Sequence, residues 1–142
     1  MTTPGRPPHL TLPALALVGL GGLAGTAARY ALTLLVPDRH GWPVATLSVN
    51  LVGAFVLGLL LEGLARRGPD RGTRRRARLV VGTGFCGAFT TYSALAVDVD
   101  LLLRDGQTVT AVAYGLTTVA VGFLVCTLGI WIGARLTPRA AA

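Results

Sequence analysis

The sequence predicts an all-α membrane protein of four transmembrane helices, because it is strongly apolar and its apolar residues form four long stretches. Of its 142 residues, 52% are hydrophobic and 13% are charged, and the mean hydropathy is +0.63. A soluble domain carries about 25% charged residues. Each stretch reaches the roughly 20 residues that a helix needs to cross a bilayer. Together they use most of the chain, so we expect a single membrane domain over 1–142.

The four expected helices follow one another closely along the chain. They cover approximately residues 10–36, 42–65, 77–103 and 108–136. The first stretch has the outline of a secretory signal peptide, with Arg6 ahead of an apolar run. That run is longer than the roughly 7–15 residues of a signal peptide. We therefore expect it to remain as the first of the four spans.

The third stretch contains the most informative motif of the chain, Gly82–Ser93. It combines three glycines with the successive hydroxyl residues Thr90, Thr91, Tyr92 and Ser93. Glycine is about 1 kcal/mol less favourable than alanine inside a helix. A membrane helix that breaks must satisfy its freed backbone groups with protein, ions or water, and such breaks form ion and substrate sites in transporters. We expect the third helix to be broken at mid-membrane, and the protein to act in transport.

The arginines are distributed unequally between the two sides of the membrane. All thirteen basic residues are arginine, and seven of them lie in the connection 66–78. With four spans, this connection shares a side with both termini, which add Arg6, Arg135 and Arg139. Ten arginines then face two, Arg39 and Arg104, on the other side. The positive-inside rule places both termini and the Arg-rich loop in the cytoplasm of a multi-pass plasma-membrane protein.

The Arg-rich loop has a second implication, for the partners of the protein. Clusters of arginine beside a membrane span attract anionic lipid headgroups. Nucleic-acid binding is not expected, because the loop is short and has no aromatic residues between its arginines to stack on bases. Membrane lipid is therefore the expected partner of this loop.

Polar residues inside the membrane are costly and mark functional sites by default. The predicted spans have no carboxylate at mid-depth, since Asp98 and Asp100 come late in the third span. A proton-coupled cation exporter needs such a carboxylate to exchange a proton for its substrate. The spans instead offer hydroxyl and amide donors, aromatic edges and one guanidinium, that of Arg29. These groups suit a small anion.

Two helices present polar residues at helical spacing. Thr46 and Asn50 are four residues apart and share a helix face, and Tyr114, Thr118 and Gly122 repeat at the same interval. Two such stripes could line a narrow polar track. The alternative is ordinary hydrogen bonding between helices, which averages about 0.6 kcal/mol per bond.

Small residues also recur in two GxxxG pairs, Gly21 with Gly25 and Gly129 with Gly133. Such pairs let helix backbones approach closely, and they serve either packing within one chain or contact between two chains. The spacing by itself leaves both uses open.

Three segments resemble the Fluc (CrcB) fluoride-channel family: Gly22–Tyr30, Ala45–Phe55 and Gly82–Ser93. They occur in the order and spacing of the family and cover essentially the whole chain. The resemblance implies a passive, fluoride-selective channel that exports cytoplasmic fluoride and relieves its toxicity. It also implies an antiparallel dimer of four-helix subunits with two pores.

The resemblance further implies a structural sodium ion at the break of the third helix. Its ligands would be the backbone carbonyls of Gly87 and Thr90. Transition-metal ligands are not expected. The implied lining of the anion pore includes Asn50, with Thr46, Tyr114 and Thr118 in the polar track.

Arg29 has two interpretations. It would attract anions or anchor the vestibule, the mouth of the anion pore. Alternatively, it would be a structural guanidinium tied to helix-end carbonyls. The family also places two phenylalanines on the third helix, whose positive ring edges face the anion. Those positions hold Tyr92 and Leu95 here. Leucine has no ring quadrupole, and Gly122 stands where the family commonly has a hydroxyl, so one pore lining is expected to be degraded.

The arginine bias bears on the dimer. An antiparallel homodimer requires one sequence to insert in both orientations, whereas ten arginines against two fix a single orientation. We therefore expect a heterodimer with a paralogous subunit of opposite topology.

Two other functions are weighed against the channel. A small multidrug-type exporter has a similar length, but it would need a buried glutamate in the first span, which is absent. A non-transporting membrane scaffold would explain the GxxxG pairs and the basic loop, but not the broken helix or Asn50. No nucleophile–base pair or metal cluster indicates an enzyme.

Overall fold

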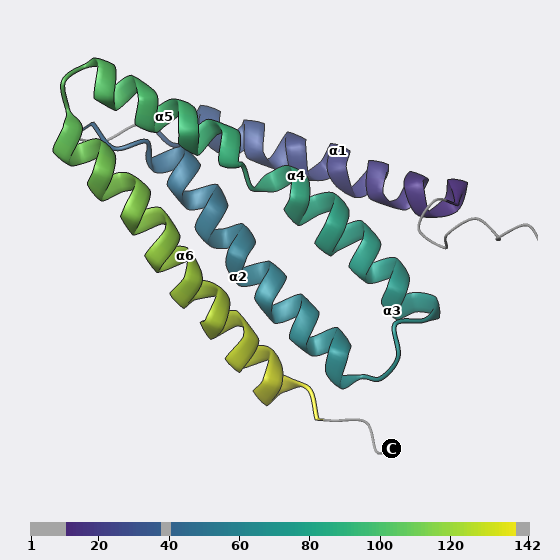
Figure 1. The fold of residues 1–142 in the computed structure, drawn as a ribbon. Coiled ribbons are helices and arrows are strands. Elements are labelled where there is room, and N and C mark those ends of the chain that lie inside the picture. Colours follow the sequence, from purple (N-terminus) through teal and green to yellow (C-terminus); the bar gives the residue numbers. More distant parts are fainter. Residues whose placement is uncertain (1–10, 38–40, 139–142) are drawn as a thin grey trace, which may run out of the picture.

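The computed structural model describes residues 11–37 and 41–138 and is helical throughout its long elements (Figure 1). Helices α1 (Leu12–Leu35), α2 (Val44–Arg66) and α6 (Thr108–Leu136) are continuous. A third span runs over Gly72–Arg104 in several pieces. All four are long and apolar enough to cross a membrane. The predicted all-helical fold with four spans is confirmed, and the chain is a multi-pass membrane protein.

A few sequence predictions fall outside the described residues. The first span was expected to start at Leu10, and the arginine count used Arg6, Arg39 and Arg139. These four residues lie in the undescribed segments.

The third span is interrupted, as the glycine- and hydroxyl-rich motif predicted. It consists of α3 (Gly72–Ala77), the π-helical segment η2 (Arg78–Cys86), the short α4 (Gly87–Phe89) and α5 (Tyr92–Arg104). Between α4 and α5 the backbone is extended, with ψ 156° at Thr90 and φ −149° at Thr91. Segments of π-helix also tend to mark functional regions.

The Arg-rich connection is shorter than the predicted loop 66–78. The helix of the third span begins at Gly72 rather than near Ala77, so Arg74, Arg75 and Arg76 lie on a helical turn. Arginine and alanine are good helix formers. Gly72 has φ +55°, a left-handed conformation that lets the chain turn into the helix.

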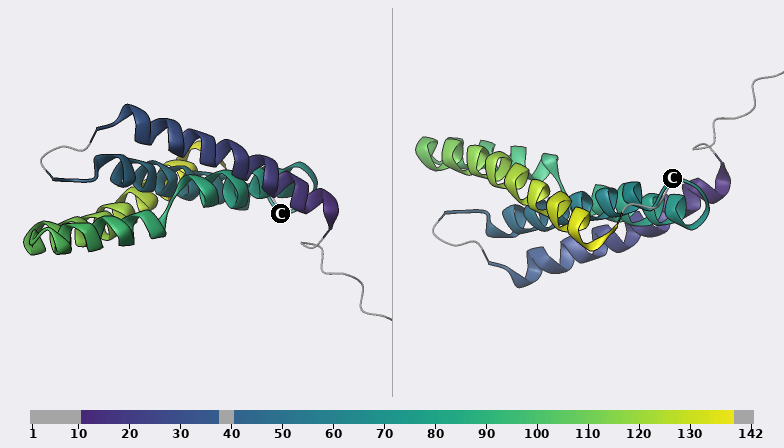
Figure 2. Two further views of the ribbon diagram at one scale, coloured as in Figure 1. Left: turned by 90° about the horizontal axis from the view of Figure 1, so that it is seen from above. Right: turned by 90° about the horizontal axis from the view of Figure 1, so that it is seen from below.

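The four spans run up and down in sequence, so that the helix ends gather at two ends of the molecule. Figures 1 and 2 show the start of α1, the α2–α3 connection and the end of α6 toward one end. The end of α1, the start of α2 and the α5–α6 connection lie toward the other. The first end carries most of the described arginines and is called the Arg-rich end below.

The helices pack closely through glycine. Gly21 and Gly25 of α1 lie so near the third span that a Cβ at either would collide with the carbonyl groups of Val80 and Phe85. On α6, Gly129 and Gly133 meet the backbone of α2 in the same way. Both GxxxG pairs therefore serve packing inside the subunit, with α6 on α2 and α1 on η2.

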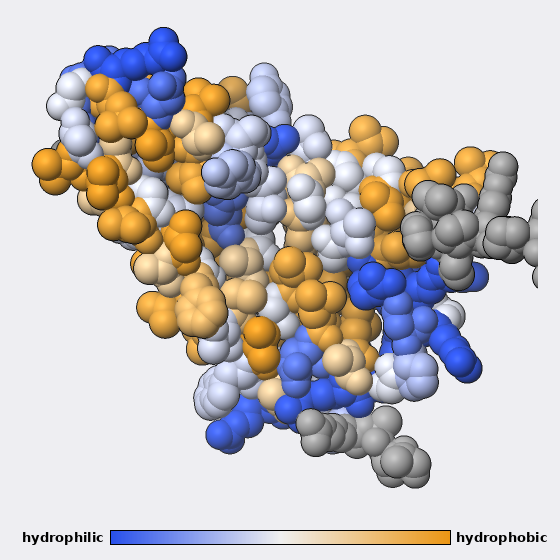
Figure 3. Space-filling view, viewed as in Figure 1, coloured by the Kyte–Doolittle hydropathy of each residue, from blue (hydrophilic) through white to orange (hydrophobic). Residues whose placement is uncertain are grey.

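The surface between the two ends is apolar. Figure 3 shows hydrophilic residues gathered at the ends and hydrophobic residues over most of the area between them. Large apolar side chains such as Leu23, Phe123 and Trp131 are more than half exposed. Such a surface is stable against lipid, and the helices satisfy their own backbone hydrogen bonds there.

Candidate functional site

The break in the third span is held by one side chain of α2. The Asn50 amide oxygen accepts a hydrogen bond from the Thr91 backbone N–H at 2.7 Å, and the Asn50 amide nitrogen donates to the Thr91 carbonyl at 3.0 Å. One amide thus pairs with both polar groups of one residue. A residue whose N–H and C=O are both free of the helix ladder occurs where a helix is interrupted or ends. Asn50 and the break therefore stabilise each other.

The same bonds release two carbonyl groups from the helix ladder. In a continuous helix the Thr91 N–H would donate to the Gly87 carbonyl and the Ala94 N–H to the Thr90 carbonyl. Here Thr91 donates to Asn50 instead, and Ala94 donates to the Thr91 hydroxyl at 3.1 Å, an N-cap of α5. The carbonyls of Gly87 and Thr90 thereby lose their helical donors, which leaves them available to another partner.

Close contact between the break and α2 depends on Gly53. A Cβ at this position would collide with the methyl group of Thr90. Thr90 is fixed on its other side by its own N–H and hydroxyl, which both donate to the Cys86 carbonyl at 3.0 and 2.9 Å. Gly53 lies three residues after Asn50, so the same stretch of α2 both admits and binds the break.

An open groove of about 330 Å³ lies beside the break, between α2, α5 and α6. It brings together four of the predicted pore residues, namely Asn50, Tyr92, Leu95 and Thr118. An amide carries two N–H donors, and the second donor of Asn50 remains beyond its bond to Thr91. The groove is thus a largely apolar space with a neutral donor beside it.

Thr118 has a more limited donor role than the sequence predicted. Its hydroxyl donates back to the Tyr114 carbonyl within α6 at 2.8 Å. A hydroxyl has a single proton, so Thr118 must leave this bond to donate into the groove. Gly122 also lines the groove, at the position where a further hydroxyl was expected from the family.

Arg29 and Thr46 line a different cavity, of about 280 Å³, together with Thr26 and Tyr30. The polar track predicted from Thr46 and Asn50 is therefore divided between two spaces. Thr91 lines both, so the two cavities adjoin at the break. We refer to them as the Asn50 groove and the Arg29 cavity.

The Arg29 guanidinium is partly buried and has no hydrogen-bond or ion-pair partner within residues 11–37 and 41–138. The structure shows no bond from it to helix-end carbonyls of those residues.

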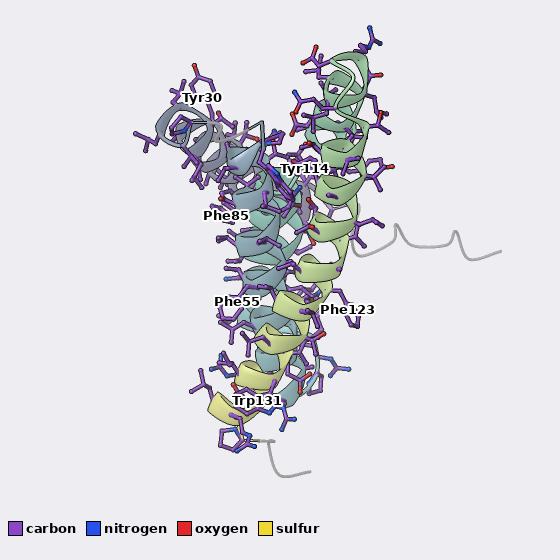
Figure 4. All side chains as sticks on the ribbon, turned by 90° about the vertical axis from the view of Figure 1, so that its left-hand side faces the viewer. Tyr30, Phe55, Phe85, Tyr114, Phe123 and Trp131 are labelled. Carbon is purple, nitrogen blue, oxygen red and sulfur yellow. The ribbon has the colours of Figure 1, made fainter. Side chains whose placement is uncertain are left out.

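Tyr114 is removed from both cavities. It is fully buried, its hydroxyl donates to Asp98 at 3.1 Å, and its ring meets Trp42 edge-on at 5.9 Å between ring centroids. Figure 4 shows it between α6 and its neighbouring helices, well apart from Tyr30 on α1. Tyr114 thus packs the α5–α6 pair, and the spacing of Tyr114 with Thr118 did not reveal this.

Two residues at the site had no role assigned from sequence. Thr91 caps α5, pairs with Asn50 and borders both cavities, whereas the sequence marked it only as one of four hydroxyl residues. Asp98 was noted only as lying late in the span. The signal for Thr91 was the buried amide of Asn50, which requires a partner offering both a donor and an acceptor.

Comparisons with known proteins identify the family of the chain. The family described as CrcB-like protein, Camphor Resistance (CrcB), matches residues 16–130. A protein of Leifsonia xyli named fluoride-specific ion channel FluC 2 is 46% identical over 133 residues, 94% of this chain and 92% of the relative. FluC 1 of Cutibacterium acnes is 52% identical over 76% of each chain, and FluC 2 of Moorella thermoacetica is 43% identical over 82% of this chain and 93% of the relative. These relatives are named as ion channels and not as enzymes. The chain belongs to the CrcB-like family.

Proposed function

We propose that this protein is a pore-forming subunit of a passive channel that is selective for fluoride and releases it from the cytoplasm. The observation that carries the proposal is the Asn50 groove, an apolar path beside a broken span with a neutral amide donor, in a chain related to fluoride-specific channels. The protein would lie in the plasma membrane with both termini in the cytoplasm, as the arginine bias favours.

Export needs no energy source other than the fluoride gradient. Hydrogen fluoride is a weak acid that crosses the bilayer uncharged, dissociates in a less acidic cytoplasm and leaves fluoride trapped there. An anion pore lets this fluoride leave and relieves its toxicity. The proposed residues of the pore provide weak, neutral contacts, which suit passage because an ion must be able to leave each site.

The amide of Asn50 supplies the central donor of the groove. Tyr92 adds an aromatic ring with a positive edge. Leu95 provides only apolar surface, so the part of the pore that this subunit lines is the weaker one. Thr118 contributes a hydroxyl when its bond to the Tyr114 carbonyl opens, and Thr46 faces the Arg29 cavity beside it.

The donor set at the break fits a structural sodium ion. Gly87 and Thr90 would hold it through their backbone carbonyls, the two groups that lose their helical donors. Unwound carbonyls of broken membrane helices coordinate sodium in transporters. A bound sodium would supply a fixed positive charge that favours anion entry.

The break lies on a face that another subunit would cover. Tyr92 is 83% exposed, and Gly87, Thr83 and Ser93 are exposed on the same span. Polar groups at membrane depth are rarely left facing lipid. We propose an antiparallel dimer through this face, with a paralogous subunit of opposite topology as the partner, because the arginine bias opposes insertion in both orientations.

Efflux from liposomes tests the function. The protein is reconstituted alone and with its paralogue of opposite arginine bias, and fluoride and chloride release are followed with ion-selective electrodes. We expect fluoride release with little chloride release, and only when both chains are present. Fluoride release from this chain alone would overturn the proposal that the channel must be a heterodimer. Absence of fluoride release from every combination would overturn the channel and favour a membrane scaffold.

A further inference from the structure

A second groove, away from the break, opens at the Arg-rich end between α2, η2 and α6. It measures about 330 Å³. Its walls include Leu60, Gly63, Val81 and Leu136, and Arg67 lies at its end beside α2. We call it the Arg67 groove. Nothing in the ion path uses it.

The Arg67 groove has the length of one lipid leaflet. Its residues on α2 extend from Val56 to Arg67. Eleven residues of helix at 1.5 Å each span about 16 Å. The hydrocarbon core is about 30 Å thick, so one leaflet accounts for roughly half of that. An acyl chain lying along the apolar wall would therefore place its headgroup near Arg67.

Arg67 differs from Arg66 and Arg78 in having no ion pair among the described residues. Its neighbour Arg66 pairs with Glu62 at 2.6 Å, and Arg78 pairs with Asp70 at 2.6 Å. The hydrogen bond from Arg78 lowers the pKa of Asp70, which keeps that carboxylate charged and paired. Arg67 is exposed and has no acidic partner in the described part of the chain.

A second groove at this end of the molecule also combines an apolar wall with arginines at its edge. A smaller groove of about 240 Å³ between α1 and α3 has Leu17 and Leu79 in its wall and Arg75 and Arg76 at its edge. Figure 3 shows the hydrophilic surface of this end directly adjoining hydrophobic surface. An apolar wall that ends at a cation complements an amphiphile with an anionic head.

We propose that the Arg67 groove binds an anionic phospholipid, with one acyl chain along α2 and the phosphate at Arg67. The Thr137 hydroxyl, which also lines the groove, is placed to donate to the headgroup. Juxtamembrane arginines attract anionic headgroups by about 1 kcal/mol each. This binding does not depend on which ion the channel conducts.

Native mass spectrometry of the purified protein tests the site. Phosphatidylglycerol and phosphatidylcholine with identical acyl chains are titrated, and bound lipid is counted. We expect phosphatidylglycerol to bind more tightly, and Arg67→Gln to weaken it about fivefold. Arg71→Gln is the matched control, since Arg71 is exposed on the same connection but lines none of the grooves described here. We expect it to change binding less than twofold.

A second variant tests the acyl-chain wall. Gly63→Val should fill the groove, since a Cβ at Gly63 would make only an ordinary contact, 3.5 Å from the Thr137 hydroxyl oxygen. It should weaken both lipids while the thermal unfolding midpoint stays close to wild type. Gly19→Val is the control, because a Cβ at Gly19 meets nothing within 4 Å.

Four results would overturn the proposal. They are equal binding of the two lipids, equal effects of Arg67→Gln and Arg71→Gln, displacement of bound lipid by soluble glycerol phosphate alone, and a Gly63→Cys variant that forms a disulfide with a second copy of the chain.

Discussion

The Asn50 groove and the Arg29 cavity lie on either side of Thr91, yet they offer an anion different chemistry. The first has a neutral amide, an aromatic ring and aliphatic walls. The second has a guanidinium and hydroxyl groups. A full positive charge in a low-dielectric site attracts an anion over a long distance and also holds it strongly. In the proposed channel, attraction and passage would be assigned to different places, because a conducting site must let its ion leave.

The two cavities also differ in what fixes them. Asn50 is bonded to the backbone of Thr91 through both of its polar atoms, so the groove cannot change without changing the break. Arg29 has no hydrogen-bond or ion-pair partner among the described residues, so no such bond ties its guanidinium to the cavity wall. Substitutions in the Asn50 groove and in the Arg29 cavity should therefore change fluoride efflux by different amounts.

The largest effect is expected from Asn50→Ala. This change removes the pore donor together with two hydrogen bonds that hold the break. At about 1 to 1.5 kcal/mol for each bond, fluoride efflux through the pore that Asn50 lines should fall on the order of 100-fold in liposomes that hold both chains. Ser48→Ala on the same helix is the control and should leave efflux within about twofold of wild type. Unchanged efflux in Asn50→Ala would mean that neither the amide nor its hold on the break matters for conduction.

A smaller effect is expected from Arg29→Gln. Losing one partly buried charge should reduce efflux on the order of tenfold at low ionic strength, and less in high salt, because salt screens the attraction. Measuring efflux over a range of inert salt concentrations separates this from a loss of structure. Arg104→Gln is the control, since Arg104 is exposed and already paired with Asp100. A deficit that does not shrink with salt would place Arg29 among the structural residues.

The smallest effect is expected from Leu95→Phe. Restoring an aromatic ring edge to the Asn50 groove should raise fluoride efflux by a few-fold, since one favourable ring contact is worth about 0.5 to 1.5 kcal/mol. Val97→Phe adds a ring on the exposed face of the same helix and should not raise it. Equal efflux in both variants and wild type would show that Leu95 does not weaken the pore.

Much of the fold follows from local sequence. The four spans come from apolar length, and the break comes from glycines and hydroxyls in Gly82–Ser93. The third helix was predicted to begin near Ala77 but begins at Gly72, five residues earlier, because a charged segment beside the membrane has no apolar boundary to mark it. Local helix propensity there favours the earlier start.

The site was less predictable, because it depends on contacts between segments far apart in the chain. Sequence spacing grouped Thr46 with Asn50, but the break packs against α2 so that they line different cavities. It also grouped Tyr114 with Thr118, whereas Tyr114 is turned to Asp98 on α5. Asn50 itself was identified because an amide inside the membrane is costly to leave without a hydrogen bond. This cost can be recognised from the sequence without knowing which residue is the partner.

The break is the feature shared by the two cavities, and we propose that its freed carbonyls form a cation site rather than a local defect. Fluoride efflux in sodium buffer and in N-methylglucamine buffer tests this most directly, with both chains of the proposed heterodimer washed free of sodium and reconstituted together. We predict that efflux is lost without sodium and returns when sodium is restored. Equal efflux in the two buffers would contradict the proposed role of the Gly87 and Thr90 carbonyls.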